Sequence, residues 1–286
     1  MVSIVIPTFN RVSRVQEAVE SVRAQSYCDW ELLVIDDGSE DRTEAAIRSI
    51  EDSRVRYIRV SHGGVSRARN IGIRLSRFPW ICFLDSDDRW AERKLELQLE
   101  TLEREPALRV VYTDEIWIRR GRRVNQKKKH RKYSGWMFRP SLALCLISPS
   151  SVLLHRSVLT ETGLFDESFR VCEDYELWLR LTSRFPVRFI DQPLITKFGG
   201  HPDQLSHSEW GFDRFRIRAL LKTVVGEGLT AQYQVWTAAE IVRKALILAA
   251  GYRNRNKQET AAHYRRMAQL WLPRASWAGR LSRPTL

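Results

Sequence analysis

Three carboxylates stand close together in the sequence, directly after a short apolar run. Residues 80–84 are Trp-Ile-Cys-Phe-Leu, and Asp85, Asp87 and Asp88 follow at once. An apolar run of this length indicates a buried strand, and ligands of open α/β sheets bind just beyond the carboxyl ends of such strands. Because crowded carboxylates repel one another, their spacing favours a divalent cation that holds a phosphorylated substrate. The alternative is an acidic turn that caps the next helix, since Asp is a good N-cap residue.

Polar residues suited to a nucleotide also follow the three earlier strands that the sequence predicts. The segments are 7–11 (PTFNR), 36–39 (DDGS) and 62–70 (HGGVSRARN). Arg67 and Arg69 can offset the charge of a diphosphate. Each segment alone is common turn or surface chemistry, but four matched strand ends in one sheet indicate a single nucleotide-diphosphate site. The sequence lacks the glycine-rich loops of dinucleotide-binding and P-loop proteins, which excludes dehydrogenases and P-loop NTPases.

The elements that must position these residues alternate between strand and helix. We expect strands at 3–6, 31–35, 55–58 and 80–84, and helices at 14–24, 41–50, 65–75 and 91–105. This alternation predicts an α/β fold with a mostly parallel sheet flanked by helices.

The pattern changes after Pro106. We expect one or two strands within 109–118, further strands at 151–154, 187–190 and 194–197, and helices at 136–146 and 172–183. From residue 208 onward only helices are expected, at 210–225, 229–249 and 258–272. The sequence therefore predicts a C-terminal helical extension on an α/β body.

The composition is that of a globular protein with an excess of positive charge. The chain has 286 residues, of which 43% are hydrophobic, and a formal net charge of +13. Such a charge favours polyanionic partners. Residues 119–132 hold nine Lys or Arg and no acid, and residues 251–286 hold eight against one Glu. These segments are either solvated basic surfaces or sites for phosphate groups or an anionic membrane.

Cysteine usage and hydropathy bear on the compartment. The four cysteines form no C-x-x-C pair, so neither a disulfide framework nor a zinc site is indicated and a reducing cytoplasm fits best. The chain opens on a strand-like segment without the features of a signal peptide. The longest charge-free apolar run, 141–154, is too short to span a bilayer.

The motifs together resemble the family 2 glycosyltransferases of GT-A (Rossmann-like) fold. Residues 2–11, 34–39, 64–72 and 83–88 match that family's nucleotide-sugar half in order and spacing. The resemblance covers residues 1–205, with 1–110 as the nucleotide-sugar half and 111–205 as the acceptor half, and leaves 206–286 as a basic helical extension. It implies transfer of a sugar from a nucleoside diphosphate sugar with inversion at the anomeric carbon, and it implies Mg²⁺ or Mn²⁺.

The resemblance also assigns roles on the donor side by position. Thr8 and Phe9 would border the nucleotide base, and Asp37 would accept a hydrogen bond from it, which favours uracil and leaves dTDP- and GDP-sugars open. Arg69 and Asn70 would lie beside the sugar diphosphate.

The metal would fall to the D-x-D pair that the resemblance identifies. Asp87 is expected to bind it directly, and Asp85 is expected to act through the ribose or a water molecule. Asp88 would be a supporting carboxylate or the cap of the following helix, and we favour the cap. His201, in a glycine-rich loop, is a further candidate ligand of the metal or the diphosphate.

A second acidic segment supplies the candidate base. Residues 163–167 (GLFDE) and 172–179 (CEDYELWL) resemble the G-x-F-D-E and E-D motifs of the same family. That resemblance places the general base on Asp174, with Glu173 orienting it or contacting the acceptor. The alternative is that these acids only enrich the first turn of a helix, where its dipole favours them. Phe165 and Trp178 are expected in the core, and His62 and His155 are interpreted as structural.

The acceptor side is indicated by charge alone. Residues 119–148 would border the acceptor cleft, and their charge suggests a glycan or a lipid-diphosphate-linked glycan at an anionic membrane face. We expect an enzyme of cell-envelope polysaccharide biosynthesis that is cytoplasmic or peripheral at the inner face of the membrane. A sugar-nucleotide pyrophosphorylase is disfavoured because residues 7–10 lack its glycine-rich loop. A nucleic-acid- or anionic-surface-binding protein without catalysis is the remaining alternative, although no nucleic-acid-binding module is present.

Overall fold

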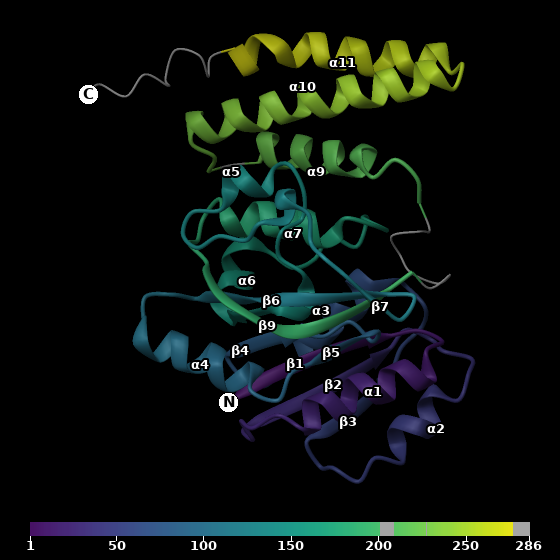
Figure 1. The fold of residues 1–286 in the computed structure, drawn as a ribbon, viewed down its shortest axis with the longest axis vertical. Helices are drawn as coiled ribbons and strands as arrows, with labels where there is room; N and C mark the ends of the chain where they lie inside the picture. Colours follow the sequence, from purple (N-terminus) through teal and green to yellow (C-terminus); the bar gives the residue numbers. More distant parts are fainter. Residues whose placement is uncertain (201–208, 227, 277–286) are drawn as a thin grey trace.

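The computed structural model describes residues 1–200, 209–226 and 228–276 of the chain. Within these residues nine strands form one mixed sheet in the order β3-β2-β1-β4-β8-β6-β9-β5, with β7 paired to β6. Helices cover both faces of the sheet. On one of these two faces, a further layer of helices stacks outside the first layer (Figure 1). The predicted α/β fold is confirmed.

The first half of the sheet is parallel, as the alternation predicted. Its strands are β1 (Val2–Thr8), β2 (Trp30–Asp36), β3 (Val55–Arg59) and β4 (Trp80–Phe83). They are joined through α1 (Val12–Arg23), α2 (Thr43–Arg48) and α3 (Val65–Leu75). In the register of this half Thr8 lies opposite Asp36, so the carboxyl ends of β1 and β2 meet at one edge.

The second half of the sheet is mixed. Its elements are β5 (Asp88–Trp90), α4 (Lys94–Arg104), β6 (Val110–Arg119), β7 (Arg122–Val124), α5 (Phe138–Ser141), β8 (Val152–His155), α6 (Arg156–Thr162), α7 (Glu173–Thr182) and β9 (Arg188–Gly199). Strand β8 runs antiparallel to both β4 and β6, whereas β9 is parallel to β6 and antiparallel to β5. The first four strands are therefore all parallel, whereas the second half combines antiparallel pairs with the one parallel pair β6–β9.

Two local predictions differ from the structure. The strands expected on either side of Pro193 are one strand, β9, because the ladder with β6 shifts its register opposite that proline. A shift of this kind accommodates a residue without an N–H. Only the single turn α5 forms where a helix was expected at 136–146. Met137, Phe138 and Leu142 are buried there, and the helical spacing of buried residues does not continue over the rest of the range.

Alternating side chains of the strands feed two apolar cores. On β1, Ile4 and Ile6 pack with α1, α2 and α4, whereas Val5 lies in the core that contains α3, α6 and α7. This is the two-residue period of a strand that is buried on both faces. The rigid sheet fixes the positions of the strand ends that carry the polar residues.

The three predicted C-terminal helices are present as α9 (Asp213–Val225), α10 (Ala231–Asn254) and α11 (Gln258–Ser276). They stack outward from α7 (Figure 1). Ala219 and Leu220 of α9 and Ile241 of α10 share a core with Tyr175 and Leu179 of α7. The extension is thus packed on the α/β body. Among the described helices none is long and apolar enough to cross a membrane.

We predict that Gly72→Ala destabilises the fold although Ala favours helix. A Cβ at Gly72 would overlap the side chain of Val5, where α3 lies against β1. Overpacking of a core costs about 1–3 kcal/mol, against a gain of about 1 kcal/mol in helix propensity. Urea unfolding measures the net loss, with Arg74→Ala on the exposed side of α3 as control. A Gly72→Ala protein as stable as the control would contradict the close packing.

Candidate functional site

The ends of β1 and β2 and the loop after β3 enclose a cavity of about 420 Å³, here named the strand-end cavity. Thr8, Phe9, Asp37 and His62 line it. The Oγ1 of Thr8 is buried and has no hydrogen-bond partner among the described residues, so it remains available to a ligand. Phe9 is 41% exposed, and its ring centre lies 4.4 Å from that of His62. His62, interpreted from sequence as structural, therefore belongs to the wall of this cavity.

Asp37 organises the loop beside this cavity. Its carboxylate accepts hydrogen bonds of 2.8 Å from the backbone N–H of both Gly63 and Gly64. It also lies 2.9 Å from Nδ1 of His62. Gly64 has a φ of +92°, a left-handed conformation that favours glycine and allows this approach. Asp37 thus holds the segment that leads into α3.

The three carboxylates of the sequence cluster line a second cavity of about 240 Å³, here named the acidic cavity. Asp85, Asp87 and Asp88 all contribute to its wall. Pro7, Arg11, Val65 and Ser86 line both this cavity and the strand-end cavity. The two cavities therefore form one continuous trough along the strand ends.

Arg69 joins the two acidic motifs. Its guanidinium donates to Oδ1 of Asp85 at 2.6 Å and to Oε1 of Glu173 at 2.8 Å, and the residue is only 2% exposed. Burial disfavours the charge of Arg69, but the two carboxylates outweigh it and raise its pKa. The pKa of Asp85 is lowered, since the attraction of Arg69 overcomes the effect of burial. Burial and the neighbouring charge of Asp174 raise the pKa of Glu173 to about 7.

The other two acids of the cluster have different partners. Asp87 pairs with Arg11 at 3.1 Å. Asp88 lies in β5 and accepts a hydrogen bond of 2.7 Å from Ser150, so the prediction that it caps the next helix is wrong. The reason is the pairing of β5 with β9, which draws Asp88 into the sheet. Burial raises the pKa of Asp88 well above its usual value; Lys197 opposes this effect, and Asp87 and Asp85 add to it.

Lys197 is a functional candidate that the sequence analysis missed. It lies opposite Asp88 in the β5–β9 ladder and lines the acidic cavity. Burial opposes its charge, but Glu115, Asp88, Asp85 and Asp174 together raise its pKa, so it stays a cation. Its position beside the cluster depends on strand pairing, and no local motif marks it. A lysine here can attract the phosphate oxygens of a ligand.

The donor atoms of the acidic cavity fit a divalent cation in type. Asp85 and Asp87 offer carboxylate oxygens, and Mg²⁺ typically takes one or two carboxylates together with substrate phosphates and water. Within residues 1–200, 209–226 and 228–276, no three or more His, Cys, Asp or Glu residues are grouped so that they could hold a metal ion. His201, the other predicted ligand, lies outside the described residues. The described residues thus fit such an ion by donor type alone, with Asp85 and Asp87 as the two carboxylates.

The candidate base stands at the far end of the trough. Asp174 lies in the first turn of α7 and lines the acidic cavity with Glu173. Its Oδ1 accepts a hydrogen bond from the N–H of Tyr175 at 2.6 Å, and its Oδ2 accepts one from Sγ of Cys145 at 3.3 Å. Both contacts hold the carboxylate in place at the wall of the acidic cavity.

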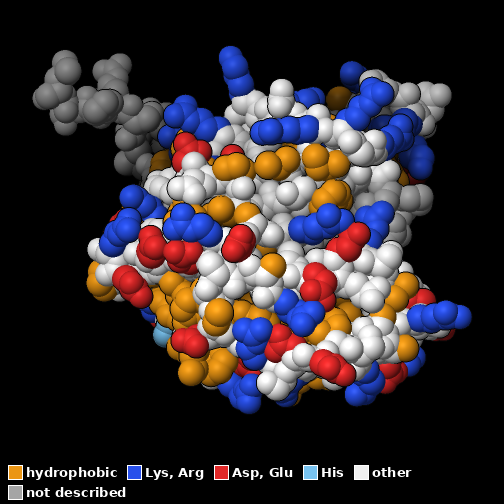
Figure 2. Space-filling view, turned by 60° about the horizontal axis from the view of Figure 1, so that its bottom comes forward, with side chains coloured by type: hydrophobic (Ala, Val, Ile, Leu, Met, Phe, Trp, Pro, Cys, Tyr) orange, Lys and Arg blue, Asp and Glu red, His pale blue; other side chains and the backbone are white. Residues whose placement is uncertain are grey.

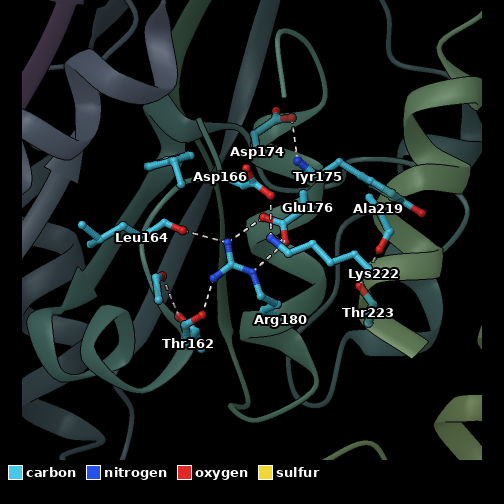
Figure 3. A network of polar contacts seen from close by, with 12 residues as sticks. Thr162, Leu164, Asp166, Asp174, Tyr175, Glu176, Arg180, Ala219, Lys222 and Thr223 are labelled. Carbon is cyan, nitrogen blue, oxygen red and sulfur yellow. Dashed lines mark hydrogen bonds and ion pairs between the residues drawn. The ribbon is translucent and has the colours of Figure 1, made fainter. Parts of the chain in front are cut away.

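A polar network holds α7 in place (Figure 3). Glu176, fully buried, is paired with Arg180 at 2.6 Å and with Lys222 at 2.8 Å. Arg180 also donates to the carbonyl of Leu164, and Lys222 of α9 reaches Asp166 at 2.7 Å. The network therefore connects the G-x-F-D-E loop, the helix of the candidate base and the C-terminal helices.

Asn70 has a different set of partners from those expected. Its amide donates to the carbonyl of Phe165 and to Glu167, and its oxygen accepts from the N–H of Phe165. It lines neither cavity, so it positions the G-x-F-D-E loop against α3. Phe165 and Trp178 lie in the core as predicted, and His155 caps α6.

Comparison with known proteins gives a consistent family. The model of glycosyl transferase family 2 matches residues 3–162. The Escherichia coli protein WfgD, named a UDP-Glc:alpha-D-GlcNAc-diphosphoundecaprenol beta-1,3-glucosyltransferase, is 31% identical over 63% of this chain and 69% of its own length. An uncharacterized glycosyltransferase of Rickettsia felis is 32% identical over 68% of this chain but only 32% of that protein. The chain thus spans about a third of the length of the first curated relatives it matches.

Solved structures share the fold. TarS 1-349 of S. aureus in complex with UDP-GlcNAc aligns over 95% of this chain and 91% of its own, with a TM-score of 0.71 and 15% identity. The mannosyltransferase PcManGT of Pyrobaculum calidifontis, in complex with GDP-Man and Mn2+, aligns over 99% and 88% with a TM-score of 0.59 and 16% identity. At these identities the likeness establishes the GT-A fold alone.

The raised pKa of Glu173 predicts a specific pH dependence of stability. A carboxyl group with a folded pKa of about 7, above the ordinary value of 4.5, stabilises the fold below pH 4.5 and loses that contribution as the pH rises through 7. Glu173→Gln removes this loss, so its free energy of unfolding relative to the native protein should rise by about 1–3 kcal/mol from pH 4.5 to pH 8.

Urea unfolding across this pH range measures the difference. Glu161→Gln, on the partly exposed side of α6, is the control and should run parallel to the native protein. A Glu173→Gln curve that also stays parallel would show that the carboxyl group titrates normally.

Proposed function

This chain belongs to glycosyl transferase family 2, and on that premise we propose that it moves a sugar from a nucleoside diphosphate sugar, with UDP as the nucleotide, to a hydroxyl of a lipid-linked glycan with inversion. The observation that carries the proposal is the continuous trough. It begins at Thr8 and Asp37, passes Asp85 and Asp87, and ends at Asp174.

The strand-end cavity would hold the nucleoside. Its aromatic pair, Phe9 and His62, offers a flat surface for a base, and the unpaired hydroxyl of Thr8 offers a hydrogen bond. Asp37 retains acceptor capacity for the N–H of uracil. The UDP-sugar bound by the structural neighbour TarS supports the choice of UDP.

The acidic cavity would hold the diphosphate. Asp87, helped by Asp85, would bind Mg²⁺ or Mn²⁺, and the ion supplies positive charge for the diphosphate that leaves. Lys197 and Arg11 line the same cavity and add cationic side chains of the protein itself. Mn2+ in the structure of PcManGT supports a metal in this fold.

Asp174 would act as the general base. Its carboxylate would take the proton of the acceptor hydroxyl while the oxygen attacks the anomeric carbon and the diphosphate departs. Glu173, held by Arg69, lies next to it and keeps the first turn of α7 in register with the acidic cluster. Inversion would require attack from the side of the anomeric carbon opposite the leaving diphosphate.

The names of two relatives support the choice of acceptor. WfgD and WfaP of E. coli are named for transfer to alpha-D-GlcNAc-diphosphoundecaprenol, which supports a lipid-linked acceptor and a part in polysaccharide biosynthesis. Residues 1–110 would bind the donor and 111–205 the acceptor, with 206–286 as a helical extension. A cytoplasmic location or the inner face of the membrane suits such substrates.

The test of the base is Asp174→Asn. The amide keeps the shape but cannot take up a proton, so transfer to a GlcNAc-diphospholipid should fall by about 100-fold or more while UDP binding persists. Initial-rate assays and calorimetry measure the two properties. Asp191→Asn, an exposed acid on β9, is the control. Near-normal turnover of Asp174→Asn would refute the assignment.

The test of the metal site is Asp87→Ala. We expect Mn²⁺ to strengthen UDP binding by the native protein, and this gain to be lost in the variant, because a carboxylate ligand is removed. Titration calorimetry with UDP, with and without Mn²⁺, measures the gain, and Asp191→Ala should retain it. An undiminished Mn²⁺ effect in Asp87→Ala would count against the metal role of this residue.

A further inference from the structure

A third cavity, of about 520 Å³, lies between β6, the basic segment 119–132 and the helices α9 and α10; we name it the basic cavity. Its size is in the range of ligand pockets. The cations in its wall come from both parts of the chain: Lys129, Lys132, Arg216, Arg243 and Lys244. The C-terminal helices thus supply three of the five cations.

The basic cavity adjoins the candidate base. Cys145 lines it, and the Sγ of this residue donates to Oδ2 of Asp174 at 3.3 Å. Asp174 itself lines the acidic cavity. One carboxylate therefore stands at the boundary between the two cavities. A ligand in the basic cavity would lie near Asp174 and outside the acidic cavity.

Two of the cations serve the fold. Lys132 is paired with Glu115 at 3.3 Å, and Lys244, only 1% exposed, is paired with Asp213 and donates to the carbonyl of Ala143. These contacts fix the wall.

The remaining cations carry a surplus of charge. Arg216 shares Asp213 with Lys244, Arg243 is paired with Glu240, and Lys129 has no ion-pair partner among the described residues. The five cations pair with four acids, namely Asp114, Glu115, Asp213 and Glu240, which leaves an excess of one positive charge.

Two polar atoms of the wall lack partners. The Nε of Arg216 and the Nδ1 of His130 are buried and make no hydrogen bond within the described part of the chain. Both residues line the basic cavity. Buried polar atoms are normally paired, so such orphans indicate a site that a polar ligand completes. The surplus positive charge and an unused guanidinium donor suit the oxygens of a phosphate or diphosphate.

We propose that the basic cavity binds the diphosphate of the acceptor, placing the sugar hydroxyl of a diphosphate-linked saccharide beside Asp174. The inference rests on the proposed glycosyl transfer and adds a location for the acceptor. It makes α9 and α10 part of the substrate site. On the face seen in Figure 2, Lys and Arg lie among Asp and Glu over the lower half and gather into no single patch there.

The experiment removes the two cations that do not hold the wall together. Lys129→Ala combined with Arg243→Ala deletes one exposed and one half-exposed side chain, so folding should persist. Lys128→Ala combined with Arg253→Ala is the matched control, because each residue comes from the same segment or helix but lines no part of the cavity. The two double variants have equal net charge.

Binding is measured on the full chain loaded with UDP and Mn²⁺, by fluorescence anisotropy of a labelled GlcNAc-diphosphate on a short lipid chain. The cavity double variant should bind this probe about 10- to 100-fold more weakly than the native protein, and the control should bind it normally. A probe with the same sugar and chain but an ether in place of the diphosphate should not distinguish the variants. Arg216→Gln should weaken binding of the diphosphate probe in the same way.

Three outcomes with the labelled probes would overturn the proposal. The first is that both double variants bind the diphosphate probe with equal affinity. The second is that the cavity double variant loses as much affinity for the ether probe as for the diphosphate probe. The third is that the native protein binds UDP but shows no saturable binding of the diphosphate probe. Binding to phosphatidylglycerol vesicles that pyrophosphate does not displace, and that falls equally in both double variants, would assign the charge to a membrane surface and likewise overturn it. Failure of the native protein to bind UDP with Mn²⁺ would instead refute the proposed function itself.

Discussion

One buried cation holds the candidate site together. Arg69 is contributed by α3 and bonds Asp85, after β4, and Glu173, at the start of α7, which are far apart in sequence. A charge so deeply buried is tolerated only when it is paired, and removing Arg69 would leave both Asp85 and Glu173 without their cationic partner. The pairing therefore obliges the two motif-bearing halves of the body to keep one relative position. The order of the trough, from Thr8 to Asp174, depends on this constraint.

The sequence identified the half of the site that parallel strands build. The strands β1, β2 and β4 end at one edge of the sheet. Residues at or just after these ends, such as Thr8, Asp37 and Asp85, therefore lie near one another irrespective of the loop conformations. The spacing of the apolar runs in the sequence was sufficient to predict that these residues converge. Trp178 and Phe165 were also assigned correctly to the core, since their places in apolar segments matched the helix and loop that bury them.

The rest depended on contacts that no local pattern records. Lys197 reaches the acidic cavity because β9 pairs with β5, and the same pairing turned Asp88 from an expected helix cap into a sheet residue. Asn70 faces the loop at Phe165, since α3 packs against the second half of the chain. The basic cavity forms because α10 places Arg243 and Lys244 near the segment 119–132. Long-range pairing and helix stacking are set by the whole fold, so residue types alone could not place these groups.

The link from Lys222 to Glu176 and Asp166 has a consequence for how this protein can vary. The outer helices contact the segment that carries the candidate base, and they also line the basic cavity. Exchange of that layer between relatives would alter both the seating of α7 and the choice of acceptor in one step. Related proteins could in this way differ in the glycan that they extend while the nucleotide-binding half stays the same. New outer helices that are grafted onto this body should therefore retain Lys222.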